Sequence, residues 1–278
     1  MMENIKKLAG CLRQLTCGGG DACPGNWRYL GVDLTHWDYV VALAGNPNTG
    51  KSSIFNALTG LRQHTGNWPG KTVIRAEGGF QYEHKRYKLI DLPGTYSLLS
   101  MSADEEIARD FILFGQPDCT IVMVDATCLE RNLNLVLQIL EMTGKAVIAL
   151  NFMDEARRKN MDIDSRRLAR DLGVPVVATV AKTGEGIRPL ILEAVNIVTG
   201  AVKTQPHKVE RSAALKQAIE ELVPFIEKMC PGLPSADWIA VRLIEGDIGV
   251  REALLSGRLA SWGEKKDLKE ERKKGPRP

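Results

Sequence analysis

One short segment of the chain has the spacing of a phosphate-binding loop. Residues 45–52 read GNPNTGKS, in which the glycine residues allow the backbone to wrap around a phosphate so that several N–H groups point inward. In this pattern Lys51 reaches the outer phosphates, and the Ser52 hydroxyl binds Mg²⁺. The alternative interpretation is a glycine-rich turn that contains a lysine by chance.

The motif DLPG, at residues 91–94, supplies the groups that a bound triphosphate needs next. Asp91 can hold Mg²⁺ through water, and the N–H of Gly94 can bind a γ-phosphate. The tetrapeptide alone is common in turns. Its position after residues 45–52 makes the two motifs together typical of a nucleoside triphosphatase.

Two later motifs indicate which base is bound. NFMD, at residues 151–154, ends in Asp154, whose carboxylate can accept two N–H bonds from guanine, a pair of donors that adenine lacks. TVAK, at residues 179–182, would present the backbone N–H of Ala181 to the guanine carbonyl. Alone, NFMD is a weak signal whose alternative is an Asx turn. In this order, the motifs predict GTP rather than ATP.

The elements that must position these motifs are predicted by the pattern of apolar residues. Buried strands are indicated by the runs YVVALAG, YKLID, CTIVMVD, KAVIALN and VPVVATV, and helical patterns lie between most of them. This alternation predicts an α/β fold with a mostly parallel sheet of six to seven strands and helices on both faces. Residues 72–91 predict a hairpin that places one antiparallel strand at the sheet edge.

The chain divides into four predicted regions. Residues 1–37 are rich in Cys and Gly, which predicts a flexible extension, and residues 38–202 hold the motifs. Residues 203–262 carry only helical patterns, which predicts a small all-helical domain. Residues 263–278 are expected to form a charged tail or linker.

Composition argues against several classes of protein. A net charge of +3 over 278 residues gives no argument for nucleic acid or for a membrane surface as a partner. No apolar run approaches the roughly 18 residues that cross a bilayer. The six cysteine residues do not suggest a secreted disulfide framework, so a reducing cytosol is expected. Cys11, Cys17 and Cys23 lack the spacing of zinc knuckles, although a metal or redox role is left open.

The four motifs, in this order, resemble a Ras-like P-loop GTPase domain. Further segments narrow the match, namely RQHTGNWPGKTV at the position of the first switch, DLPGTYSLLS, and WIAVRLIEGD in the helical region. Over about residues 38–262, the chain resembles the cytosolic N-terminal part of the bacterial ferrous iron transport protein B family. The resemblance covers neither the Cys-rich first segment nor the tail.

The resemblance implies a function and partners. It implies that residues 38–202 bind and hydrolyse GTP, and that the helical domain favours retention of GDP, in the manner of a guanine-nucleotide-dissociation inhibitor. It also implies a membrane domain that carries Fe²⁺ and is absent from this chain, and small Feo accessory proteins as partners. We therefore expect a soluble fragment of a transporter that acts at the cytoplasmic face of the bacterial inner membrane. No nucleic acid is expected, and a homo-oligomer is left open.

The resemblance also carries roles to particular residues. Thr72 would bind Mg²⁺ and sense the γ-phosphate, and Asn48 would bind an activating K⁺ together with the carbonyls of Gly66 and Trp68. The expected ligands of Mg²⁺ are Ser52, Thr72 and, through water, Asp91. The expected catalytic residues are Asn48, Lys51, Thr72 and Gly94. The residues expected to bind GTP are Gly45, Asn46, Pro47, Asn48, Thr49, Gly50, Lys51, Ser52, Ser53, Gly70, Thr72, Asp91, Gly94, Asn151, Phe152, Asp154, Thr179, Val180 and Ala181.

Two residues depart from the general GTPase pattern. Thr95 follows Gly94, where Ras-like proteins have a glutamine that positions water. Hydrolysis should therefore be slow, unless K⁺ supplies positive charge. Phe152 stands where many GTPases have a lysine beside the base, so the guanine pocket should be looser and nucleotide exchange faster.

Several polar residues have simpler interpretations than a functional one. His64 and His84 are candidate iron ligands, but solvated loop histidines are the commoner case. The acidic run at residues 104–106 is best explained as the first turn of a helix. Trp68 is expected to act through its backbone, and the alternative is a packing role for its ring.

Two other functions compete with the transporter interpretation. The first is a stand-alone K⁺-type GTPase of ribosome assembly or tRNA modification. The helical region, with mixed charge as in SAALKQAIEELVPFIEK, argues against RNA binding and so against this alternative. The second is a nucleotide sensor with negligible turnover, which Thr95 leaves open.

Overall fold

The computed structural model describes residues 30–60, 63–99, 102–231, 233 and 235–255. The contacts divide the chain into two compact units, and the larger one is Asp33–Lys208. The described part of the other unit comprises residues 30–32, 209–231, 233 and 235–255. Cys11, Cys17 and Cys23 and the predicted tail lie outside the described residues, and the predicted domain boundaries stay predictions.

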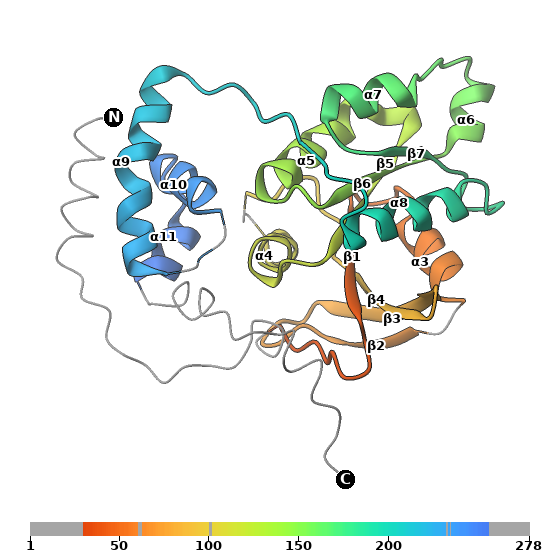
Figure 1. Ribbon diagram of the computed structural model, residues 1–278, viewed down its shortest axis with the longest axis horizontal. Helices are drawn as coiled ribbons and strands as arrows, with labels where there is room; N and C mark the ends of the chain where they lie inside the picture. Colours follow the sequence, from red (N-terminus) through yellow and green to blue (C-terminus); the bar gives the residue numbers. More distant parts are fainter. Residues whose placement is uncertain (1–29, 61–62, 100–101, 232, 234, 256–278) are drawn as a thin grey trace, which may run out of the picture. The chain divides into compact units, whose positions relative to one another are not determined.

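The larger unit is built on a seven-stranded sheet with the strand order β2-β3-β4-β1-β5-β6-β7 (Figure 1). The strands are β1 (Tyr39–Gly45), β2 (Gln63–Asn67), β3 (Ile74–Tyr82), β4 (Lys85–Asp91), β5 (Cys119–Asp125), β6 (Ala146–Asn151) and β7 (Val176–Ala178). Neighbouring strands are parallel from β4 through β1, β5 and β6 to β7. The β2–β3 and β3–β4 pairings are antiparallel. This confirms the predicted mostly parallel sheet.

The hairpin expected over residues 72–91 is present, but its antiparallel strand does not form the edge of the sheet. Strand β3 pairs with β4 as expected, and β2 adds a further antiparallel strand outside β3. Strand β2 reads QHTGN, which has neither an apolar run nor an alternating pattern. Local sequence therefore did not predict it, and its pairing with β3 decides its structure.

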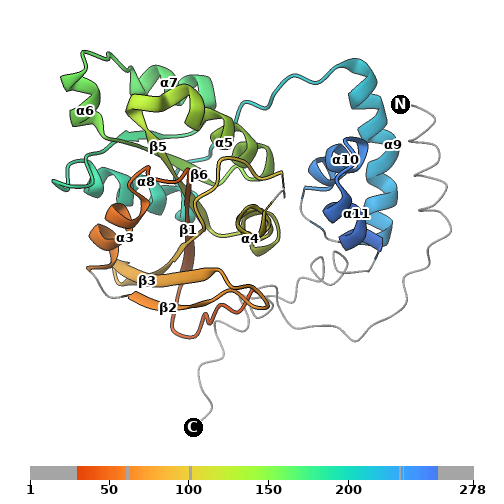
Figure 2. The same cartoon turned by 180° about the vertical axis from the view of Figure 1, so that it is seen from behind.

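Helices cover both faces of the sheet. The helices of this unit are α3 (Lys51–Thr59), α4 (Ala103–Asp110), α5 (Leu129–Met142), α6 (Met153–Arg158), α7 (Ser165–Leu172) and α8 (Ile187–Thr199). A π-helix, η1 (Phe111–Gly115), continues α4, and a short 3₁₀ turn, η2 (Ala126–Cys128), precedes α5. Helices α3 and α8 lie side by side, as Figure 1 and Figure 2 both show.

Alternation along the central strand explains why both faces are filled. Val41 and Leu43 of β1 belong to a buried cluster with Phe55 of α3 and Leu190 of α8. Ala42, which lies between them, is also fully buried and points to the opposite face. Strands buried on both faces read as continuous apolar runs, which is the pattern seen in the sequence.

The second unit, from residue 209 to the end of its described part, contains three helices. They are α9 (Ala213–Met229), α10 (Ala236–Ile244) and α11 (Ile248–Leu255). Ser212 caps α9 by accepting a hydrogen bond from the Leu215 N–H at 3.3 Å. Leu222 and Ile226 of α9 are buried, as is Ile239 of α10, the helix against which α9 packs. Among the described helices, none combines the length and apolarity that a bilayer span needs.

Candidate functional site

The predicted phosphate loop lies between β1 and α3, and its glycines are required by close contacts. A Cβ on Gly45 would lie 2.7 Å from Met123 Cβ of β5. Gly50 precedes α3 with φ 85°, in the left-handed region, and a Cβ there would overlap the Asn151 amide. Inside the loop, the Thr49 hydroxyl donates to the Asn46 carbonyl at 2.8 Å. The loop is therefore a rigid turn that leads directly into the N-terminus of α3.

Asn151 connects three of the predicted motifs. Its side chain is fully buried at the end of β6. Its Nδ2 donates to the carbonyl of Thr49 at 3.0 Å, and its Oδ1 accepts from the N–H of Ala181 at 3.0 Å and the hydroxyl of Thr179 at 3.4 Å. The phosphate loop, NFMD and TVAK are thus brought together at the carboxyl edge of the sheet, where α/β folds bind ligands. The N–H of Ala181, expected to meet guanine, is in this structure donated to Asn151.

Asp154 lies in the first turn of α6, directly after the guanine motif leaves the sheet. The preceding residue, Phe152, has φ 61°, a left-handed conformation that turns the chain between β6 and α6. The Asp154 carboxylate is 3.4 Å from Arg158 Nη2, and its side chain is 43% exposed. The carboxylate is therefore accessible, and it can give up its contact with Arg158 to accept hydrogen bonds from a ligand.

Asp91 and Lys51 bring the predicted magnesium and phosphate groups together. Lys51 Nζ lies 3.3 Å from Asp91 Oδ1. Burial raises the pKa of the Asp91 carboxyl above its ordinary value, and the nearby ammonium of Lys51 opposes that shift. The carboxylate of Asp91 and the hydroxyl of Ser52 are hard oxygen donors, which suit Mg²⁺.

The DLPG segment runs directly beside the phosphate loop. The Leu92 N–H donates to the Leu43 carbonyl at 2.9 Å, and the Thr95 N–H donates to the Gly45 carbonyl at 3.3 Å. A Cβ on Gly94 would lie 3.3 Å from the backbone of Pro47. The Thr95 side chain is buried, so the residue at the glutamine position packs inside the protein.

The segment at the position of the first switch forms a hairpin. Gly66 lies in β2, opposite Arg75 of β3. The turn between them is closed by hydrogen bonds from the N–H of Trp68 to the carbonyl of Val73 and from the N–H of Lys71 to the carbonyl of Trp68, each at 3.0 Å. Strands β3 and β4 lie between β2 and β1 in the sheet, and the joint binding of K⁺ by Asn48, Gly66 and Trp68 stays a prediction.

Two of the predicted ligands on this hairpin differ sharply in exposure. Thr72 is exposed in the turn. Trp68 is 3% exposed, and its ring meets Phe111 edge-on with 5.6 Å between centroids. The guanidinium of Arg75 lies 5.3 Å from the Trp68 ring. The ring of Trp68 therefore has the packing role that the sequence left as an alternative, and the use of its carbonyl for K⁺ stays a prediction.

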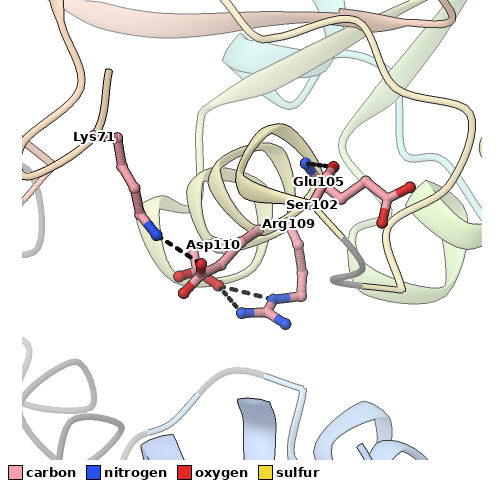
Figure 3. A network of polar contacts seen from close by, with 6 residues as sticks. Lys71, Ser102, Glu105, Arg109 and Asp110 are labelled. Atoms are coloured by element: carbon pink, nitrogen blue, oxygen red, sulfur yellow. Dashed lines mark hydrogen bonds and ion pairs between the residues drawn. The ribbon is translucent and has the colours of Figure 1, made fainter. Parts of the chain in front are cut away.

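The acidic run at residues 104–106 is the first turn of α4, as expected. Ser102 caps the helix by accepting a hydrogen bond from the Glu105 N–H at 3.2 Å (Figure 3). Glu106 of this run has a further contact that the sequence did not predict, because its Oε2 lies 2.8 Å from Lys71 Nζ.

His64 and His84, the candidate iron ligands, are exposed. Among the residues that the structure describes, no cluster of His, Cys, Asp and Glu is suited to a metal.

Comparison with known proteins places this geometry in a family. The family model described as "Ferrous iron transport protein B" matches residues 39–194. The chain is 41% identical over 212 residues to the Fe(2+) transporter FeoB of Salmonella typhimurium strain LT2, and 38% identical over 218 residues to that of Escherichia coli K12. Each match covers 75% of this chain and 27% of the relative, so the chain spans about a quarter of the length of these relatives.

Solved structures agree with this match. The cytosolic domain of the T. maritima FeoB iron transporter in apo form is 37% identical, with a TM-score of 0.72 over 84% of this chain and 90% of that one. A mutant of S. thermophilus NFeoB bound to GDP is 36% identical, with a TM-score of 0.70 over 78% of this chain and 82% of that one. Together with the sheet order, these matches confirm the Ras-like P-loop GTPase fold.

Proposed function

The chain belongs to the ferrous iron transport protein B family, and from this premise we propose that it is the GTP-binding and GTP-hydrolysing module of a bacterial Fe²⁺ membrane transporter. The observation that carries this proposal is the set of hydrogen bonds made by Asn151, which joins the phosphate loop to both guanine motifs. The S. thermophilus relative was solved with GDP, which supports a guanine nucleotide at this edge of the sheet. The family match favours the transporter over a stand-alone GTPase.

The residues of the phosphate loop would bind the triphosphate and stabilise charge during its cleavage. Lys51 is positioned by the N-terminus of α3 and would move from Asp91 to the outer phosphates. Mg²⁺, when bound, neutralises charge on the β- and γ-phosphates. Ser52 and Thr72 would hold the ion directly and Asp91 through water. We expect Thr72 to leave its present turn to do so, because that turn is held to the α4–η1 segment through Trp68 and Lys71.

We expect hydrolysis to be slow and stimulated by K⁺. Thr95 is buried and offers no side chain to orient water. Asn48 is exposed in the phosphate loop with φ 64°, so its amide is accessible to a cation beside the phosphates. The carbonyls of Gly66 and Trp68 would complete the shell after the hairpin rearranges. A catalytic electrostatic contact typically contributes on the order of 10²-fold in rate.

The test compares GTP turnover in K⁺ and in Na⁺ at equal concentration. We expect faster turnover in K⁺, because Na⁺ is too small to span the same ligands. Asn48→Ala should abolish the difference while leaving GDP binding largely intact. Equal rates in the two salts for the unmutated protein would reject K⁺ activation and leave Asn48 with a role in loop structure only.

Thr72→Ala tests whether the first switch takes part in hydrolysis. The hydroxyl is needed only when Mg²⁺ and the γ-phosphate are held together, so hydrolysis should fall far more than GTP binding. Single-turnover hydrolysis and calorimetric titration of GTP and GDP measure the two effects. A parallel loss of GDP affinity would indicate damage to the fold instead.

The remaining parts of the proposal concern the longer protein. The full-length protein would carry a C-terminal membrane domain for Fe²⁺, and this chain would face the cytoplasm at the bacterial inner membrane. The helical unit would favour GDP retention, and small Feo accessory proteins would be partners. A protein that extends beyond Pro278 with several long apolar segments would support this assignment.

A further inference from the structure

The turn of the first switch is attached to α4 by a charged contact. Lys71 of this turn points toward α4 (Figure 3). Its Nζ lies 2.8 Å from Glu106 Oε2. The two side chains are 36% and 27% exposed, so the pair is partly shielded from solvent. Lys71 immediately precedes Thr72, the residue proposed to bind Mg²⁺.

An apolar contact joins the same turn to the same helical segment. Trp68 begins the turn, and its buried ring packs edge-on against Phe111, the first residue of η1. Arg75, at the start of β3, covers the ring at 5.3 Å and pairs through Nε with Glu77 Oε1 at 2.6 Å. The turn is thus held to the α4–η1 segment at its first residue by packing and at Lys71 by charge.

Movement of Thr72 to the phosphate loop would disturb the charged contact. Strand β4 lies between β3 and β1 in the sheet, and the contacts of Trp68 and Lys71 hold the turn before β3 to the α4–η1 segment. In the proposed function, Thr72 leaves this turn to bind the same ion as Ser52. Because Lys71 and Thr72 are joined by one peptide bond, the backbone of Lys71 moves away from Glu106 when Thr72 moves toward Ser52, which works against the ion pair.

We propose that the Lys71–Glu106 ion pair is a latch that holds the first switch in its hairpin position, so that a nucleoside triphosphate must break it on binding and a diphosphate leaves it intact. This regulation rests on the proposed function, because it concerns how the same site distinguishes GTP from GDP. A ligand shifts such an equilibrium only by its different affinity for the two states. The latch therefore lowers affinity for the triphosphate and leaves affinity for the diphosphate unchanged.

The size of the effect follows from the exposure of the pair. Partly exposed ion pairs typically change an equilibrium constant about two- to fivefold, and salt screens them. Titration of GDP and of the non-hydrolysable GTP analogue GMPPNP, at fixed Mg²⁺ and K⁺, measures the affinity ratio. We expect Lys71→Met and Glu106→Gln each to raise GMPPNP affinity relative to GDP by this factor. The double variant should show no further gain, because each substitution removes the same Lys71–Glu106 contact.

Lys85→Met is the matched control. Lys85 is the first residue of β4, and its Nζ lies 3.6 Å from Asp38 Oδ1. The substitution removes the same charge from another ion pair of this sheet. It should leave the affinity ratio unchanged. Added choline chloride at constant K⁺ screens the nucleotide charge alike in both proteins, and it should narrow the difference in affinity ratio between the unmutated protein and the double variant.

Three results would overturn the latch. They are an unchanged ratio in both single variants, additive gains in the double variant, and an equal fall in both affinities in either single variant. If the unmutated protein binds both nucleotides, these results reject the latch alone. If it binds neither, the proposed function fails and the latch fails with it.

Discussion

At the scale of single residues, the site is organised by a buried amide rather than by a charge. Asn151 has no exposed surface and makes hydrogen bonds to Thr49, Thr179 and Ala181. A buried polar side chain with this many partners has one stable orientation, since any other leaves several groups unsatisfied. The side chain of the neighbouring Asp154 is partly exposed instead, which is appropriate for a group that must meet a ligand.

Base selection should depend on Asp154. Asp154→Asn is expected to lose GTP affinity and to gain affinity for xanthosine nucleotides, because the amide presents a donor where guanine needs an acceptor. Calorimetric titration of both nucleotides measures the change. Glu155→Gln is a matched control, because Glu155 lies 3.9 Å from the same Arg158 and its loss should not alter base preference. Unchanged GTP affinity in Asp154→Asn would place the guanine contact elsewhere.

Asp91 should make stability depend on pH. Its pKa is raised in the folded protein mainly by burial, so the folded state holds the proton to higher pH than the unfolded chain. The stability that this group contributes is present below the ordinary Asp pKa and is lost as pH rises through the raised value. We therefore expect Asp91→Asn to unfold at a higher temperature than the unmutated protein at neutral pH, in the absence of nucleotide.

The difference in unfolding temperature between the two proteins should disappear at low pH, because Asp91 itself becomes neutral there. Thermal unfolding of both proteins across the acidic range, followed by circular dichroism, measures it. A stability difference that stays constant with pH would show that Asp91 titrates alike in the folded and unfolded states. In Mg²⁺ and GTP the order should reverse, since the variant loses a proposed ligand.

At the scale of elements, capping and breaking residues decide where the helices begin and end. Ser102 and Ser212 both accept a backbone hydrogen bond from the first turn of the helix that follows. Helix α9 departs from the usual rules, because Pro224 lies inside it and has no N–H to donate to the preceding turn. The helical unit is therefore less stable than its length suggests.

Pro224→Ala should stabilise the helical unit. Pro224 is exposed, so the substitution restores a helical hydrogen bond and removes a steric clash without opening a cavity. We expect a gain of about 1–3 kcal/mol, which is the cost of an interior proline reduced by the freedom that the unfolded chain regains. Urea unfolding measures it, with the exposed substitution Glu227→Ala as a control near zero. A loss of stability would show that α9 needs its proline.

At the scale of the whole molecule, the segment that leaves the larger unit is held against it. The Gln205 N–H donates to the Gly173 carbonyl at 3.0 Å, and the His207 N–H donates to the Leu172 carbonyl at 3.1 Å. Thr204 donates through its hydroxyl to the Gly144 carbonyl. This connection toward the helical unit thus behaves as part of the sheet-containing unit up to residue 207.

Gly173→Ala should release this segment. Gly173 has φ 72°, and a Cβ there would overlap the carbonyl of Gln205. Gly200→Ala is the matched control, because Gly200 has φ 78° and no atom within 4 Å of its added Cβ. Both variants carry the left-handed cost of roughly 1–2 kcal/mol. Only Gly173→Ala should also speed hydrogen exchange of the amides of Gln205 and His207. Equal exchange in the two variants would contradict this role of the segment.

The amino-acid sequence by itself determined the kinds of elements and the order of the motifs. The apolar runs predicted the parallel strands, and the spacing of residues 45–52 and 91–94 predicted which strand ends carry the site. The first turn of α4 was also predicted from its acidic residues. These features are local, because side-chain periodicity and turn chemistry depend on residues a few positions apart.

Only the tertiary structure decided which distant residues meet. Strand β2 exists through its pairing with β3, the amide of Asn151 reaches the carbonyl of Thr49 across 102 positions, and Lys71 reaches Glu106 across 35. No local sequence pattern predicts such pairs, because each polar side chain has many possible partners along the chain. The packing of α4 and the order of the strands select one partner for each, and that selection holds the first switch in its present position.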